Sequence, residues 1–577
     1  MSLMAELQRR KVFKVGAAYL VVAWLAVQAA SIAFPAFEAP LWALRVFILL
    51  ALLGFPLAVV MAWVFDATPE GMRLDTSMSG SKRVFAGAAL LIVLALGWYV
   101  RGQPAFRNGT GTAPTATAHS PTAKPTFDAT SIAVLPFVDM SQDKDQEYFS
   151  DGLSEELLNL LAQLPQLRVI ARTSSFSFKG KEVDVATIAK ALGVANVLEG
   201  SVRKSGKTLR ITAQLIRASD SSHLWSQTYD RELTDVFKVQ DEIAGAVVDA
   251  LKVRLLPDQA MSNSHRSTNV EAYNLFLLGN ELYKRSSPTS WGQAISAYRQ
   301  AIALDGQYAA AYAAMARAEG FLADSMGNEA DMAQALAHGS KAIALAPALS
   351  DGYVTRGISR LSFTKDWSGA QADLEKALAL NPGDSDVQVG YGRLMTALGR
   401  VPEAIVATRK ATELDPLSTS SWAELGRLLN VLGQYPEARK ALDRSVELSP
   451  ESEYSLFHRG MSDLLDHRAR DALVAFRGGD SPYAGAGIAM AEYTLGHAEA
   501  SQQALDHEIA AYSKGGAYQI AEVYAWRGER DKAFEWLGRA YDQHDGGLSF
   551  IKADPLVASL RNDPRFPAFL AKIGLPK

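Results

Sequence analysis

A short proline-ended motif recurs at a nearly constant spacing in the second half of this sequence. It reads Ala-Ile-Ala-Leu-Ala-Pro347, Ala-Leu-Ala-Leu-Asn-Pro382, Ala-Thr-Glu-Leu-Asp-Pro416 and Ser-Val-Glu-Leu-Ser-Pro450. The four prolines lie 35, 34 and 34 residues apart. A period of this length is typical of arrays of stacked helix pairs, in which each pair buries its apolar face against its neighbours. The sequence therefore predicts an all-α superhelix in this region.

Small residues repeat with the same period, at positions where the two helices of a pair must approach closely. They are Gly392, Gly426 and Gly460 in the first helices, and Ala404, Ala438 and Ala472 in the second helices. This pattern resembles the tetratricopeptide repeat, which implies an array of about seven or eight units over residues 265–545. Residues 546–577 are expected to cap the array by covering the apolar face of its last unit.

Apolar residues are concentrated in three runs near the start of the chain: Val15–Phe34, Leu41–Val64 and Val84–Val100. About 20 apolar residues in a helix cross the hydrocarbon core of a bilayer. These runs predict a three-helix transmembrane anchor over residues 15–100, after a cytoplasmic stub of residues 1–14. The basic residues of that stub favour a cytoplasmic N-terminus, so three crossings place the soluble region in the periplasm. The predicted localisation is the bacterial inner membrane, multi-pass; the alternative is a cleaved signal peptide over residues 9–30.

Residues 101–130 are rich in Pro, Thr, Ala and Gly, which predicts a flexible linker. The next segment, residues 131–256, mixes strand and helix patterns. A half-buried antiparallel strand is predicted where four apolar residues alternate with polar ones: Leu209, Ile211, Ala213 and Leu215. Helical spacing over residues 153–164 and 236–253 completes the prediction of a small α/β domain.

Five separated motifs in this segment carry a family resemblance. They are Ser131–Phe137, Tyr148–Ser154, Val169–Ser174, Leu198–Arg203 and Leu224–Asp230. They resemble the bacterial domain related to FlgO and the TolB amino-terminal region, which implies a cell-envelope context. Related chains carry an adenylate-cyclase or winged-helix domain at their cytoplasmic end. This sequence departs from them, because the segments before the first predicted span and between the second and third are too short for either domain to fold.

One loop in the α/β segment resembles a phosphate-binding loop. Gly200 and Gly206 precede Lys207 and Thr208, but five residues separate the two glycines where the motif has four. That motif also requires a helix next, whereas Thr208 begins an alternating strand. The segment Lys204–Lys207 is therefore predicted to be a hairpin turn.

Residue types that carry catalysis do not gather in this sequence. There are no cysteines, which excludes thiolate metal sites and cysteine nucleophiles. The nine histidines are scattered and form no His-Glu-x-x-His motif. The chain has a net charge of −4, so it lacks the overall positive potential that is typical of nucleic-acid-binding proteins. We predict no catalytic residue, no cofactor, no metal site and no nucleic-acid partner.

The first helices of stacked repeats line a concave groove, and the residue after each packing glycine is expected to face it. This argument nominates Asn280, Arg393, Arg427 and Met461, with Asn430 one turn beyond Arg427. Arg393 and Arg427 are one period apart and are predicted to form a cationic rung for an acidic ligand. The alternative is a solvated surface on which two arginines coincide by accident.

The predicted fold is thus multidomain, with a transmembrane anchor, a small α/β domain and a tetratricopeptide superhelix. The predicted function is a membrane-embedded scaffold that binds protein or peptide partners of the cell envelope, and it is not an enzyme. The alternative is a sensory or regulatory subunit that acts on a separate cytoplasmic effector. Homo-oligomerisation is left open.

Overall fold

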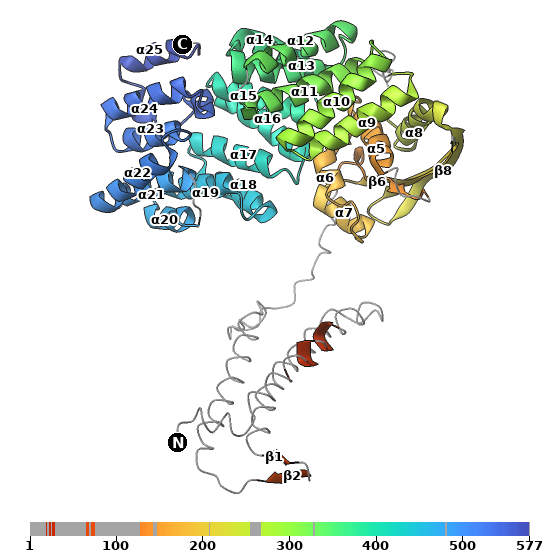
Figure 1. Cartoon of the computed structure of the whole chain (residues 1–577), viewed down its shortest axis with the longest axis horizontal. Helices are drawn as coiled ribbons and strands as arrows, with labels where there is room; N and C mark the ends of the chain where they lie inside the picture. Colours follow the sequence, from red (N-terminus) through yellow and green to blue (C-terminus); the bar gives the residue numbers. More distant parts are fainter. Residues whose placement is uncertain are drawn as a thin grey trace, which may run out of the picture. The chain divides into compact units, whose positions relative to one another are not determined.

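The computed structural model of the chain describes residues 127–141, 147–206, 208–253, 267–326, 329–478 and 482–575. In the N-terminal region it describes residues 19, 22–24, 26–28, 65–68 and 71–74. The chain divides into two compact units, Met1–Thr122 and Ala123–Lys577 (Figure 1). In the first unit, β1 (Phe65–Thr68) pairs antiparallel with β2 (Gly71–Leu74). The sequence patterns did not predict this hairpin.

The prediction of a three-helix transmembrane anchor is contradicted. Among the described residues, no helix has both the length and the apolar character needed to span a bilayer. The longest described helix, α11 (Ala309–Met326), has 18 residues and contains the charged residues Arg317 and Glu319. Charged side chains are costly to place in the hydrocarbon core of a bilayer. The predicted inner-membrane, multi-pass localisation and the periplasmic assignment depended on the anchor and are corrected with it. Nearly all of the predicted spans, the stub and the linker lie outside the described residues.

The second unit begins with a mixed six-stranded sheet. Its strands are β3 (Ser131–Val134), β4 (Val138–Asp139), β5 (Arg168–Val169), β6 (Asn196–Ser205), β7 (Thr208–Arg217) and β8 (Ser222–Glu232). The order is β5-β3-β6-β7-β8, with β4 also paired to β6. Strands β3, β4 and β5 run parallel to their neighbours, whereas β6, β7 and β8 form an antiparallel meander.

Helices cover both faces of this sheet because its strands alternate apolar side chains. Ile132 and Val134 point into a core shared with α5 (Glu147–Ala162) and α8 (Val236–Ala250). Ala133 and Leu135 point to the other face, against α7 (Val185–Leu192). The short helix α6 (Arg172–Phe176) follows β5. This alternation is the two-residue period of a strand buried on both faces.

The hairpin turn predicted over residues 204–207 is confirmed. Ser205 pairs with Thr208 in an antiparallel register, and Gly206 adopts φ +60°, a left-handed conformation that glycine tolerates. Strand β6 therefore runs into strand β7 and not into a helix. The segment lacks the strand-to-helix geometry of a phosphate-binding loop.

In the described part of the chain, eight helix pairs follow the sheet and stack into a superhelix (Figure 1). The first three pairs are α9 (Val270–Lys284) with α10 (Pro288–Leu304), α11 with α12 (Glu329–Leu345), and α13 (Ser350–Ser359) with α14 (Trp367–Leu380). The next three are α15 (Ser385–Ala397) with α16 (Val401–Leu414), α17 (Thr419–Val431) with α18 (Tyr435–Leu448), and α19 (Glu453–Leu465) with α20 (Ala469–Phe476). The last two are α21 (Pro482–Thr494) with α22 (Ala498–Tyr512), and α23 (Ala517–Trp526) with α24 (Arg530–Asp542).

The periodic glycines of the sequence act where first and second helices touch. A Cβ at Gly426 would collide with Leu442, and a Cβ at Gly460 would collide with Phe476. Both partner side chains are fully or almost fully buried. A larger residue at either glycine would push the two helices of the pair apart. The periodic small residues thus mark the positions where the first and second helices of a pair touch, as the sequence predicted.

The α/β region and the array share one hydrophobic core. Gln240 of α8 donates a hydrogen bond to the Tyr273 hydroxyl of α9 at 2.8 Å. The Leu277 side chain packs directly onto Gly152 of α5, and Glu155 of α5 accepts a 2.8 Å bond from Lys284. The first repeat is therefore joined to the sheet by packing as well as by the chain.

The sheet region also contacts the array a second time, four repeats along. The Ala171 N–H donates to the Leu414 carbonyl at 2.7 Å. In α6, the buried Ser174 hydroxyl donates to the Asp415 carboxylate and accepts the Leu417 N–H at 2.8 Å. The superhelix is thus fastened to the sheet region at its start and at the turn between α16 and α17.

The C-terminal segment caps the last pair. It comprises the 3₁₀ helices η3 (Gly546–Phe550) and η4 (Ala558–Leu560) and the helix α25 (Arg565–Lys572). The Ser559 hydroxyl donates to the Ala525 carbonyl of α23, and Val557 and Leu560 are fully buried. The same segment also reaches back along the array, because Phe550 meets Arg427 of α17 and Lys552 lies beside Gly399.

Candidate functional site

A cavity of about 1290 Å³ lies between the later first helices and the C-terminal segment. Helices α15, α17, α19, α21 and α23 each contribute side chains, and residues 543–547, 549–550 and 554–556 form the opposing wall. Further toward the start of the array, Met332 and Leu336 of α12 also line it. Because first helices dominate the lining, the cavity belongs to the concave side of the superhelix. Its volume exceeds that of most small-molecule pockets and suits a peptide segment.

An ion pair between a buried arginine and a half-buried glutamate lies in one wall of the cavity. Arg427 donates to both carboxylate oxygens of Glu424, at 2.8 and 2.6 Å. Its guanidinium also lies 4.5 Å from the centre of the Phe550 ring. Burial by itself would raise the pKa of Glu424, but the attraction and hydrogen bonds of Arg427 outweigh burial and lower that pKa.

Aromatic side chains form much of the same region. Tyr454 donates to Glu424 at 3.3 Å and meets Tyr483 edge to face, with ring centroids 5.9 Å apart. Phe457 lies 5.4 Å from Tyr483 by the same measure. Burial, reinforced by the positive charge of Arg427, lowers the pKa of His458 to about 3, so this histidine is neutral at physiological pH. The faces of such rings attract cations.

The α23 end of the cavity is acidic. Glu522 is 7% exposed and lines the cavity, and its carboxyl group is hydrogen-bonded to that of Asp554. Asp554 is 6% exposed, accepts the Tyr518 hydroxyl at 2.8 Å and caps the Leu556 N–H at 2.8 Å. Burial, followed by the neighbouring carboxylates of Asp554 and Asp545, raises the pKa of Glu522 well above its usual range.

Four of the five residues nominated from the sequence line this cavity. They are Arg393, Arg427, Asn430 and Met461. The fifth, Asn280, does not line it and accepts a 2.8 Å bond from the buried Tyr298 hydroxyl within the first pair. Asn430 donates to the His458 carbonyl and accepts from Ser462, so it joins α17 to α19. Met461 is 2% exposed and packs in the core.

The two arginines of the predicted cationic rung differ in their surroundings. Arg393 is exposed and has no ion-pair partner among the described residues. Arg427 is buried, and Glu424 three residues earlier on its own helix neutralises it. A pair of free cations is therefore absent from this part of the chain. The physical reason is that a guanidinium enters a buried wall only with a carboxylate partner.

Sequence reasoning missed the acidic residues of the cavity. Glu522, Asp545 and Asp554 lie in the least regular repeats and in the segment treated as a cap, where no period predicts which side chains face inward. One signal was available: Glu522 stands in the strongly apolar helix α23, between Ala521 and Val523. A lone carboxylate in such a helix is costly to bury unless it meets a partner.

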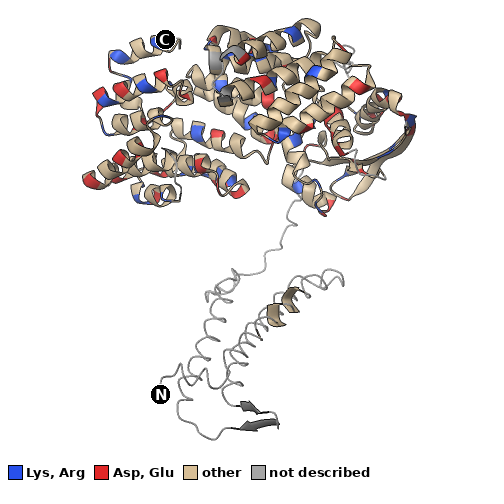
Figure 2. Cartoon of the chain, viewed as in Figure 1, with Lys and Arg blue, Asp and Glu red and all other residues tan. Residues whose placement is uncertain are grey.

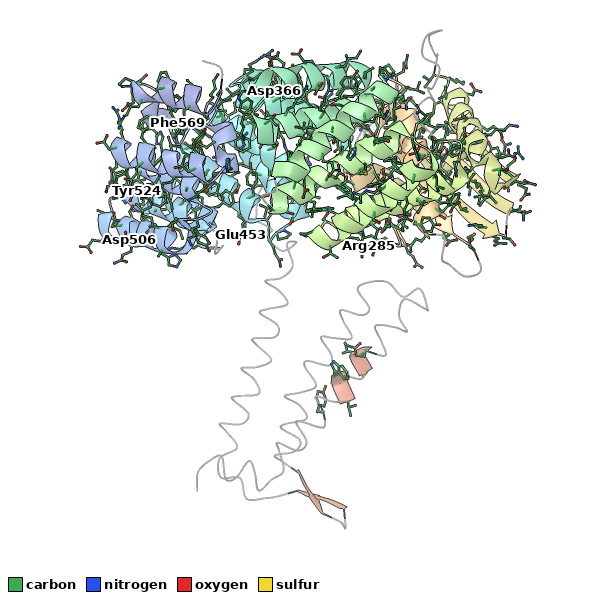
Figure 3. The ribbon with its side chains drawn as sticks, turned by 45° about the horizontal axis from the view of Figure 1, so that its top comes forward. Arg285, Asp366, Glu453, Asp506, Tyr524 and Phe569 are labelled. Carbon is green, nitrogen blue, oxygen red and sulfur yellow. The ribbon has the colours of Figure 1, made fainter. Side chains whose placement is uncertain are left out.

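Both charge signs are interspersed along the described elements (Figure 2). Arg285, Glu453 and Asp506 are exposed, whereas Tyr524 and Phe569 are buried. Figure 3 labels where these residues lie along the second unit. Among the described residues, no group of three or more acidic or histidine side chains is arranged to hold a metal ion.

Comparison with known families supports the repeat assignment. The family model "Tetratricopeptide repeat" matches residues 364–425, which cover α14, the pair α15–α16 and the first part of α17. The chain is a tetratricopeptide-repeat protein. In this tetratricopeptide protein, the model "HilA/YgeH-like transcriptional regulator, second domain" matches residues 128–246. The resemblance of that segment to the FlgO and TolB amino-terminal domains is not confirmed.

The tetratricopeptide protein also resembles individual sequences and structures. It is 40% identical over 186 residues to putative adenylate cyclase 3 of Rhizobium meliloti (strain 1021), which is 32% of each chain, so it spans about a third of that relative. The crystal structure of PilW, a type IV pilus biogenesis factor, matches 34% of this chain and 93% of its own, with 20% identity and a TM-score of 0.31. PilF of Pseudomonas aeruginosa matches 38% and 98%, with 16% identity and a TM-score of 0.31.

Proposed function

We propose that this tetratricopeptide protein is an interaction scaffold that binds a segment of a partner protein in the cavity lined by α15 to α23. The observation that carries the proposal is the cavity itself, which combines a large volume with aromatic and charged side chains. A rigid wall of aromatic anchors and a few charges is the usual basis of specific peptide recognition. The role is one of binding, and catalytic activity is not part of the proposal.

The C-terminal segment sets the form of the bound ligand. Phe550 and the residues around Asp554 cover part of the concave face and contact α15, α17 and α23. An open groove would accept a long helix, whereas this partly covered cavity favours a short extended segment. We infer that the ligand contributes a few side chains and not a continuous helical face.

A cavity-blocking variant tests this function. A random peptide library is displayed against the purified full-length chain, and the selected peptide is measured by fluorescence anisotropy. Gln519 of α23 lines the cavity and is half-buried, so Gln519→Trp should fill space and weaken binding at least tenfold. Gln503→Trp, at an exposed position of α22 that does not line the cavity, is the matched control and should bind as the unmodified chain does. Equal binding by both variants, or no selected peptide, would contradict the proposal.

A regulatory role is the second candidate, favoured by the 186 residues shared at 40% identity with a relative named as a putative adenylate cyclase. Under this proposal the bound segment would belong to a separate effector. Crosslinking through the cavity and identification of the attached peptide distinguishes the two: a cyclase, kinase or DNA-binding protein supports the regulatory role, and a structural or assembly protein supports the scaffold.

A further inference from the structure

One phenylalanine of the C-terminal segment lies in the cavity and not in the hydrophobic core. Its neighbours Leu548 and Ile551 are buried in the core of the array. Phe550 is half-buried, lines the cavity, and is not a member of that core among the described residues. The guanidinium of Arg427 lies over its ring, 4.5 Å from the ring centre. The chain therefore places an aromatic side chain of its own inside the proposed binding site.

Arg427 is suited to hold an aromatic ring because much of its hydrogen-bonding capacity is already used. Its Nε and Nη2 atoms donate to the two carboxylate oxygens of Glu424, at 2.8 and 2.6 Å. A guanidinium that is bound to a carboxylate in this way can still stack on an aromatic side chain. An anionic ligand group would have to displace Glu424 to reach these two atoms. A second aromatic ring would have to displace only Phe550.

The wall around Arg427 adds further aromatic surface. Tyr454, Phe457 and Tyr483 line the same cavity. The ring centroids of Tyr454 and Tyr483 are 5.9 Å apart, and those of Phe457 and Tyr483 are 5.4 Å apart. Aromatic rings at such distances attract one another in edge-to-face and offset arrangements. An aromatic guest in this part of the cavity would meet both a cation and other rings.

Phe550 can leave Arg427 without movement of the backbone around it. Leu548 and Ile551 hold that backbone in the core. Among the described residues, no hydrogen bond joins residues 546–551 to α15 or α17. A side chain that is only half-buried changes its rotamer rapidly. Exchange of Phe550 for a guest ring therefore needs only rotation about its side-chain bonds.

We propose that Phe550 is an internal stand-in for an aromatic side chain of the bound segment, and that the ligand displaces it from Arg427. The inference rests on the proposed binding function and adds the chemical class of the ligand residue, which is phenylalanine, tyrosine or tryptophan. Phe550 is then an autoinhibitory contact. The position on Arg427 accepts a ligand only in those molecules whose Phe550 ring has turned away, which lowers the apparent affinity.

Three fluorescein-labelled peptides test the aromatic preference: Ser-Ala-Leu-Xaa-Leu-Ala-Ser with phenylalanine, cyclohexylalanine or glutamate at the centre. Cyclohexylalanine is apolar and similar in size to phenylalanine, but it lacks the π face that attracts a cation. The full-length chain should bind the phenylalanine peptide about threefold to tenfold more tightly than the cyclohexylalanine peptide. In the double variant Arg427→Leu with Glu424→Gln, which removes the guanidinium together with its carboxylate partner, this preference should vanish.

Phe550→Ala tests the displacement. Removing the ring empties the position on Arg427, so this variant should bind the phenylalanine peptide about threefold to tenfold more tightly than the unmodified chain does. Tyr541→Ala is the matched control. Tyr541 is exposed on α24, its ring lies 4.3 Å from the Lys572 ammonium, and it does not line the cavity. The control should bind as the unmodified chain does, and circular dichroism verifies the fold of each variant.

The outcomes separate this inference from the proposed function. Binding by Phe550→Ala that is equal to or weaker than that of the unmodified chain would overturn the displacement. Equal binding of the phenylalanine and cyclohexylalanine peptides, weakened by Gln519→Trp, would overturn aromatic recognition and leave the scaffold standing. Preferential binding of the glutamate peptide would also overturn it, in favour of Arg393. If none of the three peptides binds, the inference is overturned, and the scaffold then depends on the library selection alone.

Discussion

Arg427→Met is expected to lower the free energy of unfolding of the full-length chain by roughly 3–5 kcal/mol, the range typical for breaking a buried ion pair. The Arg427 side chain is 8% exposed and bonds both oxygens of Glu424. Removing the guanidinium leaves the half-buried Glu424 carboxylate with the Tyr454 hydroxyl, at 3.3 Å, as its remaining hydrogen-bond partner. Urea denaturation followed by circular dichroism measures the loss.

A second variant separates the charge from the packing. Adding Glu424→Gln to Arg427→Met removes the unpaired carboxylate, so the double variant should recover most of the lost stability. Arg393→Met is the control on the neighbouring repeat: Arg393 is exposed and without an ion pair among the described residues, and its charge acts on Glu424 less strongly than that of Arg427, so a much smaller loss of stability is expected. A double variant as unstable as Arg427→Met would show that the arginine stem, and not the ion pair, stabilises this wall.

Glu508→Gln is expected to reduce the loss of stability that the chain suffers between pH 4.5 and pH 8. Glu508 is fully buried on α22 against Gly485, and neither carboxyl oxygen has a hydrogen-bond partner among the described residues. Burial raises the pKa of Glu508 to about 8. The folded chain therefore keeps this proton between pH 4.5 and 8 while the unfolded chain releases it, so stability falls as the pH rises through this window and levels off above it.

The size of the stability change in Glu508→Gln follows from how far the pKa of Glu508 is raised. One pKa unit corresponds to about 1.4 kcal/mol, and with allowance for solvent screening we expect the variant to save about 2–4 kcal/mol across the window. The measurement is the urea midpoint of both chains at pH 4.5, 6 and 8. Glu499→Gln on the exposed face of the same helix should leave the pH dependence unchanged. Parallel pH profiles for Glu508→Gln and the unmodified chain would contradict the buried-acid assignment.

Local patterns in the sequence predicted much of the repeat architecture. The positions of Gly426 and Gly460 predicted close contacts between the two helices of a pair, and the structure places Leu442 and Phe476 against these glycines. The alternation beginning at Leu209 predicted an antiparallel strand, and β7 follows it. Such features depend on the period of a helix or strand, which can be recognised from residues close together in the sequence. The transmembrane anchor inferred from the apolar runs near the N-terminus is contradicted, because no described helix is long and apolar enough to span a bilayer.

Charge pairing is where sequence reasoning about the site failed. Arg393 and Arg427 looked equivalent because they are one period apart, yet one is exposed and the other is held by Glu424. The acidic end of the cavity combines Glu522 of α23 with Asp554 of the C-terminal segment. No repeat period relates these two residues. Their interaction arises because the tail folds back over the concave face, where Phe550 meets Arg427.

The sequence alone determined that this chain contains stacked tetratricopeptide helix pairs and a strand-rich α/β region, because periodic apolar and small residues specify local elements and their nearest neighbours. Only the tertiary structure decided that the sheet region touches the array at Asp415 as well as at α9, and that the C-terminal segment closes part of the groove. These contacts join residues far apart in the chain, and their free energy depends on burial and charge pairing that no sequence period encodes.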